Sequence, residues 1–99
     1  MNISAIIPVF NGERTIASNI TAIKNQIQTH GKLEIIVVDD GSQDSTENVL
    51  RAIDSIRIIS QKNRGPAAAR NAGAREASGD ILVFTDADTI PHADWLEEL

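Results

Sequence analysis

Two pairs of acidic residues follow two apolar runs of the chain. Asp39 and Asp40 come directly after the run 33–38, and Asp86 and Asp88 follow the run 81–84, with one residue between them. Carboxylates are hard oxygen ligands that suit Mg²⁺ or Mn²⁺, and one or two are enough when phosphate oxygens complete the coordination. Like charges placed together cost folding energy unless something positive lies nearby. The two pairs therefore indicate a site for a cation and an anionic ligand.

The chain lacks the glycine-rich loops that usually cradle phosphate, because neither G-x-G-x-x-G nor G-x-x-x-x-G-K occurs in it. A bound diphosphate would need a cation held by carboxylates. Asp86-x-Asp88 meets that need, with one acid ligating the metal and the other positioning a sugar hydroxyl. An isolated D-x-D is more often a solvated turn with a helix cap. Asp39 and Asp40 have two open interpretations, a strand–helix turn or acceptors for a base N–H or a ribose hydroxyl.

The elements that carry these residues alternate between strand and helix. Apolar runs predict four strands, over 3–9, 33–38, 56–59 and 81–84. An isoleucine stripe at helical spacing predicts a first helix of about four turns that ends at His30-Gly31. Asp44 or Ser45 is expected to cap a second helix carrying Val49, Leu50 and Ile53. A third helix is expected from Pro66 through 67–77 to a stop at Gly79, and Pro91 is expected to open a last one.

This alternation predicts an α/β domain of the Rossmann-like kind, with a parallel sheet covered by helices on both faces. The expected strand order is 3-2-1-4. Strands of a parallel sheet have their carboxyl ends at one edge, where ligands bind. With the first strand between the second and the fourth, the acidic pairs would lie two strand spacings apart, roughly 10 Å. That distance suits a nucleotide.

Bulk properties restrict the function further. The 99 residues allow one domain, and a formal charge of −5 argues against non-specific binding of nucleic acid. The chain has no cysteine and no apolar run of the length that spans a membrane, and its first residues, which lack a basic segment, are not expected to be a signal peptide. The chain stops within an expected helix, so we expect it to be a fragment of a longer protein.

Three segments in order resemble the family 2 glycosyltransferases, which are inverting enzymes with a GT-A fold. They are "SAIIPVFNGERTI", "EIIVVDDGSQDST" and "NRGPAAARNAGAREASGDILVFTDADTIP", and together they cover nearly the whole chain. The resemblance implies that residues 1–99 are the nucleotide-sugar-binding half of such a domain and that the acceptor-binding half is absent.

The resemblance also implies roles for individual positions. The positions expected at the nucleotide are Pro8, Val9, Phe10, Glu13, Asp39, Asp40, Arg70, Asp86 and Ala87, and those expected at the metal are Asp86 and Asp88. Pro8, Val9 and Phe10 would hold the base, Arg70 would approach the base or the diphosphate, and Asp86 would contact ribose or metal. By residue type alone, Phe10 is read as a core residue, with stacking on a base as the alternative.

The activity implied by the resemblance is transfer of a sugar from a UDP- or GDP-linked donor to the hydroxyl of a saccharide or lipid-linked acceptor. Mg²⁺ or Mn²⁺ would stabilise the leaving nucleoside diphosphate. The general base is expected beyond Leu99, so this chain is expected to bind the donor only. Polysaccharide assembly, in the cytoplasm or at the cytoplasmic face of a membrane, is the setting that the family suggests.

Three other classes stay open on the sequence. A response-regulator receiver domain would use the same acidic strand ends, but it leaves residues 1–32 unexplained and lacks a lysine after Asp88. A haloacid-dehalogenase-type phosphatase would use "DADT" as its nucleophile loop, which that family carries near its beginning. A non-catalytic interaction domain is the third alternative.

Overall fold

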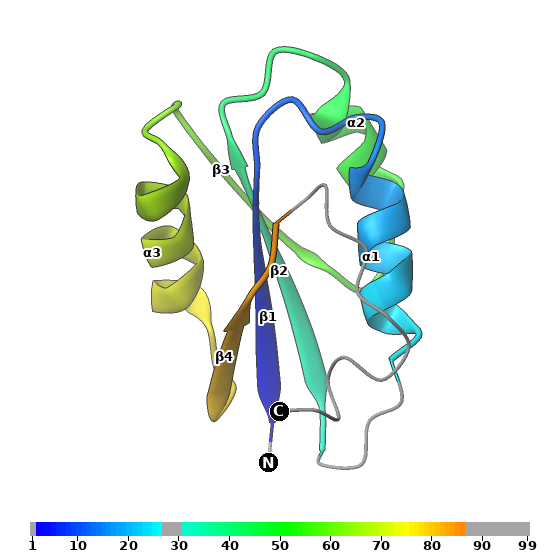
Figure 1. The fold of residues 1–99 in the computed structure, drawn as a ribbon, viewed down its shortest axis with the longest axis vertical. Helices are drawn as coiled ribbons and strands as arrows, with labels where there is room; N and C mark the ends of the chain where they lie inside the picture. Colours follow the sequence, from blue (N-terminus) through cyan, green and yellow to red (C-terminus); the bar gives the residue numbers. More distant parts are fainter. Residues whose placement is uncertain (1, 27–30, 87–99) are drawn as a thin grey trace.

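The computed structural model describes residues 2–26 and 31–86. Within these residues the chain forms a sheet flanked by helices (Figure 1). The elements are β1 Ile3–Val9, α1 Ile16–Lys24, β2 Leu33–Asp40, α2 Thr46–Arg51, β3 Arg57–Gln61, α3 Pro66–Glu76 and β4 Ile81–Phe84.

The sheet has the predicted order, β3-β2-β1-β4, and every neighbouring pair is parallel. Ile3 of β1 lies opposite Leu33 on one side and opposite Ile81 on the other, so these three strands start level. Their carboxyl ends therefore meet at one edge, where Val9 pairs with Asp39. This confirms the expected α/β class and the expected convergence of the strand ends.

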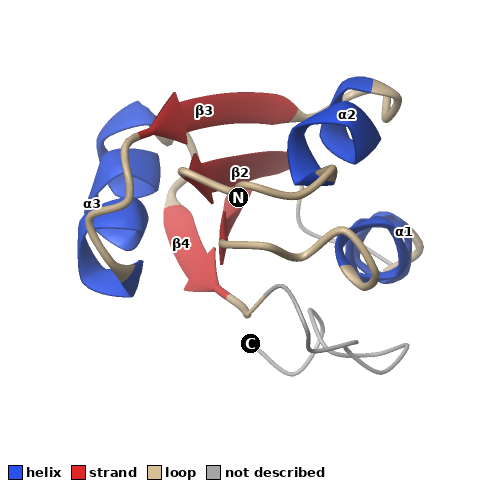
Figure 2. Cartoon of the chain, turned by 90° about the horizontal axis from the view of Figure 1, so that it is seen from above, coloured by secondary structure: helices blue, strands red, loops and turns tan. Residues whose placement is uncertain are grey.

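Helices cover both faces of the sheet, as predicted. Figure 2 shows α1 and α2 on one side and α3 on the other. The face under α1 and α2 has the larger core, made of Ala5, Ile7, Val9, Ile16, Ile20, Ile23, Ile35, Val37 and Leu50. The face under α3 is thin, with Ile6, Ile36, Val38 and Ala69 buried. Gly73 lets α3 lie close to the sheet, because a Cβ there would come within 2.5 Å of Ile6 Cγ2.

Several predicted boundaries were wrong. Helix α1 ends at Lys24, well before Gly31, with Asn25 as its C-cap, and asparagine is a weaker helix former than the residues before it. Strand β2 continues through both acids, and β3 begins one residue later than expected. Ile53 lies beyond the end of α2.

The predicted helix starts were confirmed in part. Ser45 is the N-cap residue of α2 but its hydroxyl makes no capping bond; instead Asp44 Oδ1 accepts from the Thr46 amide at 2.9 Å. Pro66 occupies the first turn of α3 as predicted. The helix expected at Pro91 lies outside the described residues. No helix in residues 2–26 and 31–86 is long and apolar enough to cross a membrane.

Candidate nucleotide site

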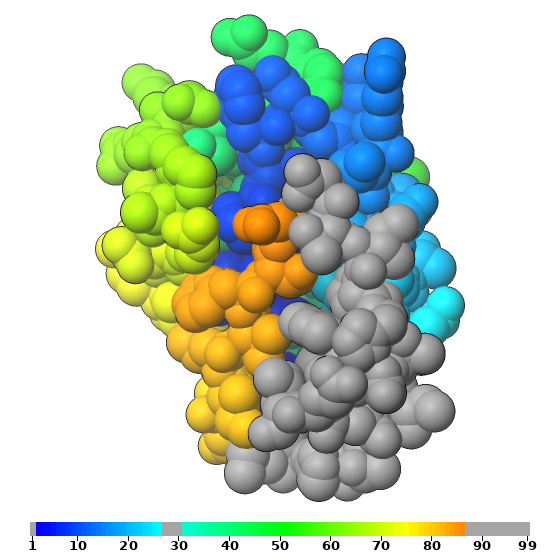
Figure 3. All heavy atoms as spheres, in the orientation of Figure 1, coloured from blue at the N-terminus to red at the C-terminus, as the bar shows by residue number. Residues whose placement is uncertain are grey.

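A pocket of about 550 Å³ opens at the carboxyl edge of the sheet. Its lining residues are Pro8, Val9, Phe10, Asn11, Gly12, Thr15, Asp40, Asn63, Gly65, Pro66, Ala69 and Asp86. In the space-filling view, the blue segment after β1 and the yellow-green α3 border this part of the molecule, with the orange end of β4 below them (Figure 3). Five of the predicted site residues line the pocket, namely Pro8, Val9, Phe10, Asp40 and Asp86.

Two helix starts line the same pocket. Thr15 is the N-cap of α1, and Gly65 is the N-cap of α3. The N-terminus of a helix carries a partial positive charge and free N–H groups, which favour negative groups beside it. The positive partner that the acidic strand ends require is thus supplied in part by the protein's own backbone.

Asp40 is held firmly by the loop that leads into α3. It is 4% exposed, and its Oδ1 accepts from Gln61 Nε2 and from the Arg64 amide, both at 2.8 Å. Its Oδ2 accepts from the Gly65 amide at 2.9 Å, and its carbonyl oxygen accepts from Asn63 Nδ2 at 3.1 Å. A carboxylate has about four acceptor positions. Three are occupied, which leaves one on Oδ2 for a ligand.

These bonds decide the charge state of Asp40. Burial alone would raise the pKa of this carboxyl, but the bonds from Gln61, Arg64 and Gly65 together outweigh burial and hold the pKa below its ordinary value. Asp40 is therefore a fixed negative charge at neutral pH. It also fixes the position of the Asn63–Pro66 loop that forms one wall of the pocket.

Asp39 lies on the opposite face of the sheet from Asp40. Successive side chains of a strand alternate, and because β2 extends through both acids, Asp39 follows Ile35 and Val37 toward the α1 and α2 side. Its Oδ1 accepts from the Ser42 amide at 3.0 Å. Asp39 is not part of the pocket lining, so the two acids form no paired charge cluster.

The loop after β1 is tied to the loop after β2 in both directions. The Asn11 amide donates to Ser42 Oγ at 2.8 Å, and Asn11 Oδ1 accepts from the Gln43 amide at 2.8 Å. The Gly12 amide donates to Thr46 Oγ1 at 2.9 Å. These bonds hold the Phe10–Gly12 segment, which forms a second wall of the pocket.

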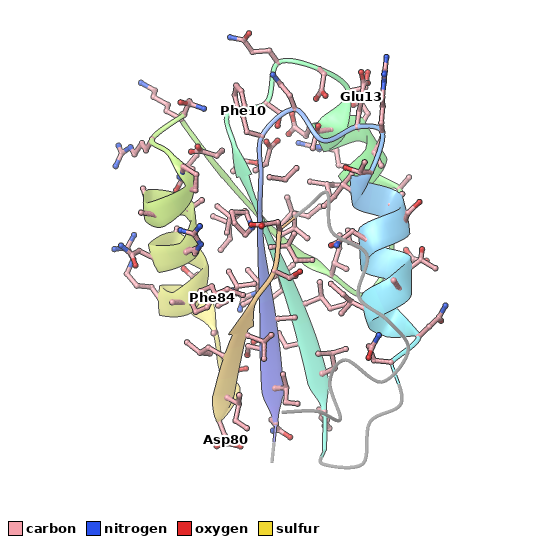
Figure 4. The ribbon with its side chains drawn as sticks, viewed as in Figure 1. Phe10, Glu13, Asp80 and Phe84 are labelled. Carbon is pink, nitrogen blue, oxygen red and sulfur yellow. The ribbon has the colours of Figure 1, made fainter. Side chains whose placement is uncertain are left out.

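Glu13 belongs to this pair of loops and is not part of the pocket lining. Its Oε2 accepts from the Ser45 amide at 3.2 Å, and its own amide donates to Asp44 Oδ2 at 3.3 Å. Figure 4 shows Glu13 and Phe10 at the same end of the molecule, far from Asp80.

Phe10 is 49% exposed. Its interpretation as a core residue was therefore wrong, and its ring is available to a ligand.

Arg70 is half-buried on α3 and does not line the pocket. No hydrogen bond or ion pair involves its guanidinium among the residues that the structure describes. Ala87 and Asp88 lie outside the described residues, so their predicted roles at the nucleotide and the metal stay predictions.

Asp86 differs from Asp40 in its surroundings. It is exposed at the end of β4 and lines the pocket. Within residues 2–26 and 31–86 no donor bonds to its carboxylate, whereas its backbone oxygen accepts from Asn19 Nδ2 at 3.2 Å. An accessible carboxylate free of protein donors can ligate a hard cation. The described residues hold no group of three acidic, histidine or cysteine side chains that could bind a metal ion, so a cation beside Asp86 would also need oxygens from a ligand.

Sequence reasoning missed several pocket residues, and Asn63 is the main one. It comes from the loop between β3 and α3. Hydrogen bonds from Asn63 and Arg64 to Asp40 hold this loop beside the end of β2, which places Asn63 in the pocket lining. Gly65 could have been found, since Gly-Pro marks a turn. Its φ of +100° is accessible to glycine at little cost.

A parallel sheet whose edge pocket is lined by acids from two strands and by two helix starts defines an α/β domain of the nucleotide-binding kind. Residues 4–99 match the family model described as glycosyl transferase family 2, and the chain belongs to this family. The fold is the nucleotide-binding part of a GT-A glycosyltransferase domain.

Individual relatives agree. The glycosyltransferase AglE of Haloferax volcanii is 42% identical over 100 residues, which covers 96% of this chain and 33% of AglE. The crystal structure of S. aureus TarS 1-349 in complex with UDP has a TM-score of 0.88 at 25% identity and covers 99% of this chain and 30% of TarS 1-349.

A second solved structure is the mannosyltransferase PcManGT from Pyrobaculum calidifontis in complex with GDP-Man and Mn²⁺. Its TM-score is 0.79 at 31% identity, covering 95% of this chain and 32% of that protein. The chain thus spans about a third of these relatives. Neither the receiver-domain nor the phosphatase alternative gains support from the comparisons. The fold also argues against a receiver, because β1, which that interpretation left unexplained, is a central strand.

Proposed function

We propose that this chain binds the nucleoside diphosphate part of a sugar donor, and that the longer protein transfers the sugar to an acceptor hydroxyl with inversion. The observation that carries the proposal is the edge pocket, which combines an exposed aromatic ring, one fixed carboxylate and one open carboxylate in a family 2 domain. Its volume of about 550 Å³ suits a ligand of nucleotide size.

The described pocket residues differ in exposure and hydrogen bonding, and each is therefore suited to a different part of the donor. Phe10 offers an exposed ring on which a base can stack. Asp40 keeps one acceptor position open for a base N–H, and the Asp40-bound loop holds Asn63 beside it. Asp86 reaches the ribose or a cation from the other side of the pocket.

We assign a divalent cation, Mg²⁺ or Mn²⁺, to Asp86 and Asp88. The open carboxylate of Asp86 fits a hard cation, and such ions take one or two protein carboxylates beside phosphate oxygens. When bound, the cation would supply positive charge to the leaving diphosphate. PcManGT was solved with GDP-Man and Mn²⁺, which supports this assignment.

Inversion requires the acceptor hydroxyl to attack the anomeric carbon from the side opposite the leaving diphosphate, with a general base to remove its proton. The residues of this chain provide the leaving-group side of that reaction. We assign the general base, and recognition of a saccharide or lipid-linked acceptor, to the part of the longer protein that its relatives possess beyond this region.

Calorimetric titration tests the proposal directly. The chain is titrated with UDP and with GDP, each with and without Mn²⁺. We expect one of the two to bind, more tightly with Mn²⁺, and we expect Asp88→Asn and Asp86→Asn to remove the effect of Mn²⁺. Asp80→Asn is the matched control, because Asp80 is an exposed aspartate at the opposite end of the sheet (Figure 4).

Absence of binding to both nucleotides would refute the donor-site proposal and favour the interaction-domain alternative. Binding that is unaffected by Mn²⁺ would refute the metal assignment alone.

A further inference from the structure

Asn19 is a polar residue in the middle of the apolar face of α1. It is fully buried, and the other buried residues of that helix are Ile16, Ile20 and Ile23. An amide in such a position contributes less hydrophobic stabilisation than leucine would, and asparagine is also a poorer helix former. Its presence calls for a reason other than packing.

The Nδ2 of Asn19 reaches across 67 residues of sequence to the backbone oxygen of Asp86, at 3.2 Å. Asp86 lies two residues beyond the end of β4 and lines the pocket. The bond therefore joins the core side of α1 to the first acid of the D-x-D segment.

The place of this bond follows from the end of the sheet ladder. The last β1–β4 pair is Ile6 with Phe84, and the Thr85 amide still donates to the Ile6 oxygen at 3.1 Å. The next donor of β1 in this register would be Pro8, which has no N–H to offer the Thr85 oxygen, so the ladder ends there. The backbone oxygen that follows, that of Asp86, accepts from the Asn19 side chain of α1.

We infer that Asn19 is a positioning residue for the metal and donor site, which sets the backbone of Asp86 so that its carboxylate faces the pocket. The inference rests on the proposed function of Asp86. It assigns to Asn19 no contact with substrate and no share in the stability of the fold.

The test separates positioning from folding. Asn19→Leu keeps the branched shape and the number of side-chain heavy atoms, adds apolar surface to the face of α1 and removes the donor. We expect its melting temperature to equal or exceed that of the wild type. We expect the gain in UDP or GDP affinity produced by Mn²⁺ to fall about three- to tenfold, the worth of one hydrogen bond. Affinity measured without metal should stay within about twofold, because the walls formed by Phe10 and Asp40 are untouched.

Two further variants make the result decisive. Asn19→Ala removes the donor with a smaller side chain and should show the same loss if Asn19→Leu does not fold. Ile23→Val removes one methyl group from the same helix face and should lower stability without changing the Mn²⁺ effect.

An unchanged Mn²⁺ effect in Asn19→Leu, or an equal loss in Ile23→Val, would overturn the inference while leaving the proposed function intact. A wild-type chain that binds nucleotide with no Mn²⁺ effect would overturn both this inference and the metal assignment, and would leave the donor-site proposal standing.

Discussion

Replacement of Asp40 by asparagine should destabilise the fold strongly. The variant keeps an oxygen for Gln61 and the Arg64 amide, but its NH₂ group then meets the Gly65 amide, so a donor faces a donor. Hydrogen bonds to a buried charged group contribute about 1.5–3 kcal/mol. We expect a loss of about 2 kcal/mol at pH 7, which for a chain of this length lowers the melting temperature by about 8–16 °C.

The pH dependence of that loss identifies its cause. Because the pKa of Asp40 is lowered in the folded chain, the carboxylate stabilises the fold at pH values above its ordinary pKa of about 4, and this contribution disappears as the pH falls through the lowered value. The difference between wild type and Asp40→Asn should therefore narrow between pH 7 and pH 3.

Thermal unfolding followed by circular dichroism measures both quantities. Asp54→Asn, the same change at an exposed position, should have little effect at either pH. A loss below about 0.5 kcal/mol for Asp40→Asn at pH 7, or a loss that does not narrow in acid, would refute the role given to this carboxylate.

Three further substitutions have defined outcomes. Gly73→Ala places a Cβ 2.5 Å from Ile6 Cγ2, and urea unfolding should show a loss of about 1–3 kcal/mol from overpacking. Gly41→Ala forces alanine into a φ of +78° with its Cβ 2.7 Å from the Asn63 amide nitrogen, so titration should show weaker nucleotide binding as well as lower stability. Glu47→Gln removes an exposed ion pair within α2, and it should leave the melting temperature unchanged within error.

Much of the fold could be predicted from the sequence, because the apolar runs that mark the strands agree with the alternation of strands and helices expected of a parallel sheet. The apolar runs of β1 and β4 are bounded by turn residues, and their observed limits equal the predicted ones. The alternation of strands and helices predicts the parallel sheet, and the expected order 3-2-1-4 is one of the usual orders of that class. Helix α1 was predicted too long because the isoleucine spacing does not reveal where the helix ends.

The site could be predicted only where a residue's own strand brings it to the edge, as for Asp40 and Asp86. Asp39 and Asp40 were expected together at the nucleotide, but β2 extends through both residues and their side chains therefore point to opposite faces of the sheet. The roles of Glu13 and Asn63 depend on hydrogen bonds between segments far apart in the chain. Asn19 left a visible signal, a lone polar residue in the isoleucine stripe of α1, but its partner is known only from the fold.

The thin apolar layer beneath α3 has a consequence for how this domain opens. Because Ala69 and Gly73 face the sheet, α3 buries little apolar surface against it. The hydrogen bonds of the Asp40 carboxylate to the residues just before α3 hold the start of the helix in place instead. Within residues 2–26 and 31–86, amide hydrogen exchange should therefore be faster in the later turns of α3 than in α1, and the Arg64 and Gly65 amides bonded to Asp40 should be protected for longer. Detachment of this helix would dismantle one wall of the nucleotide pocket while β1, β2 and α1 stay folded.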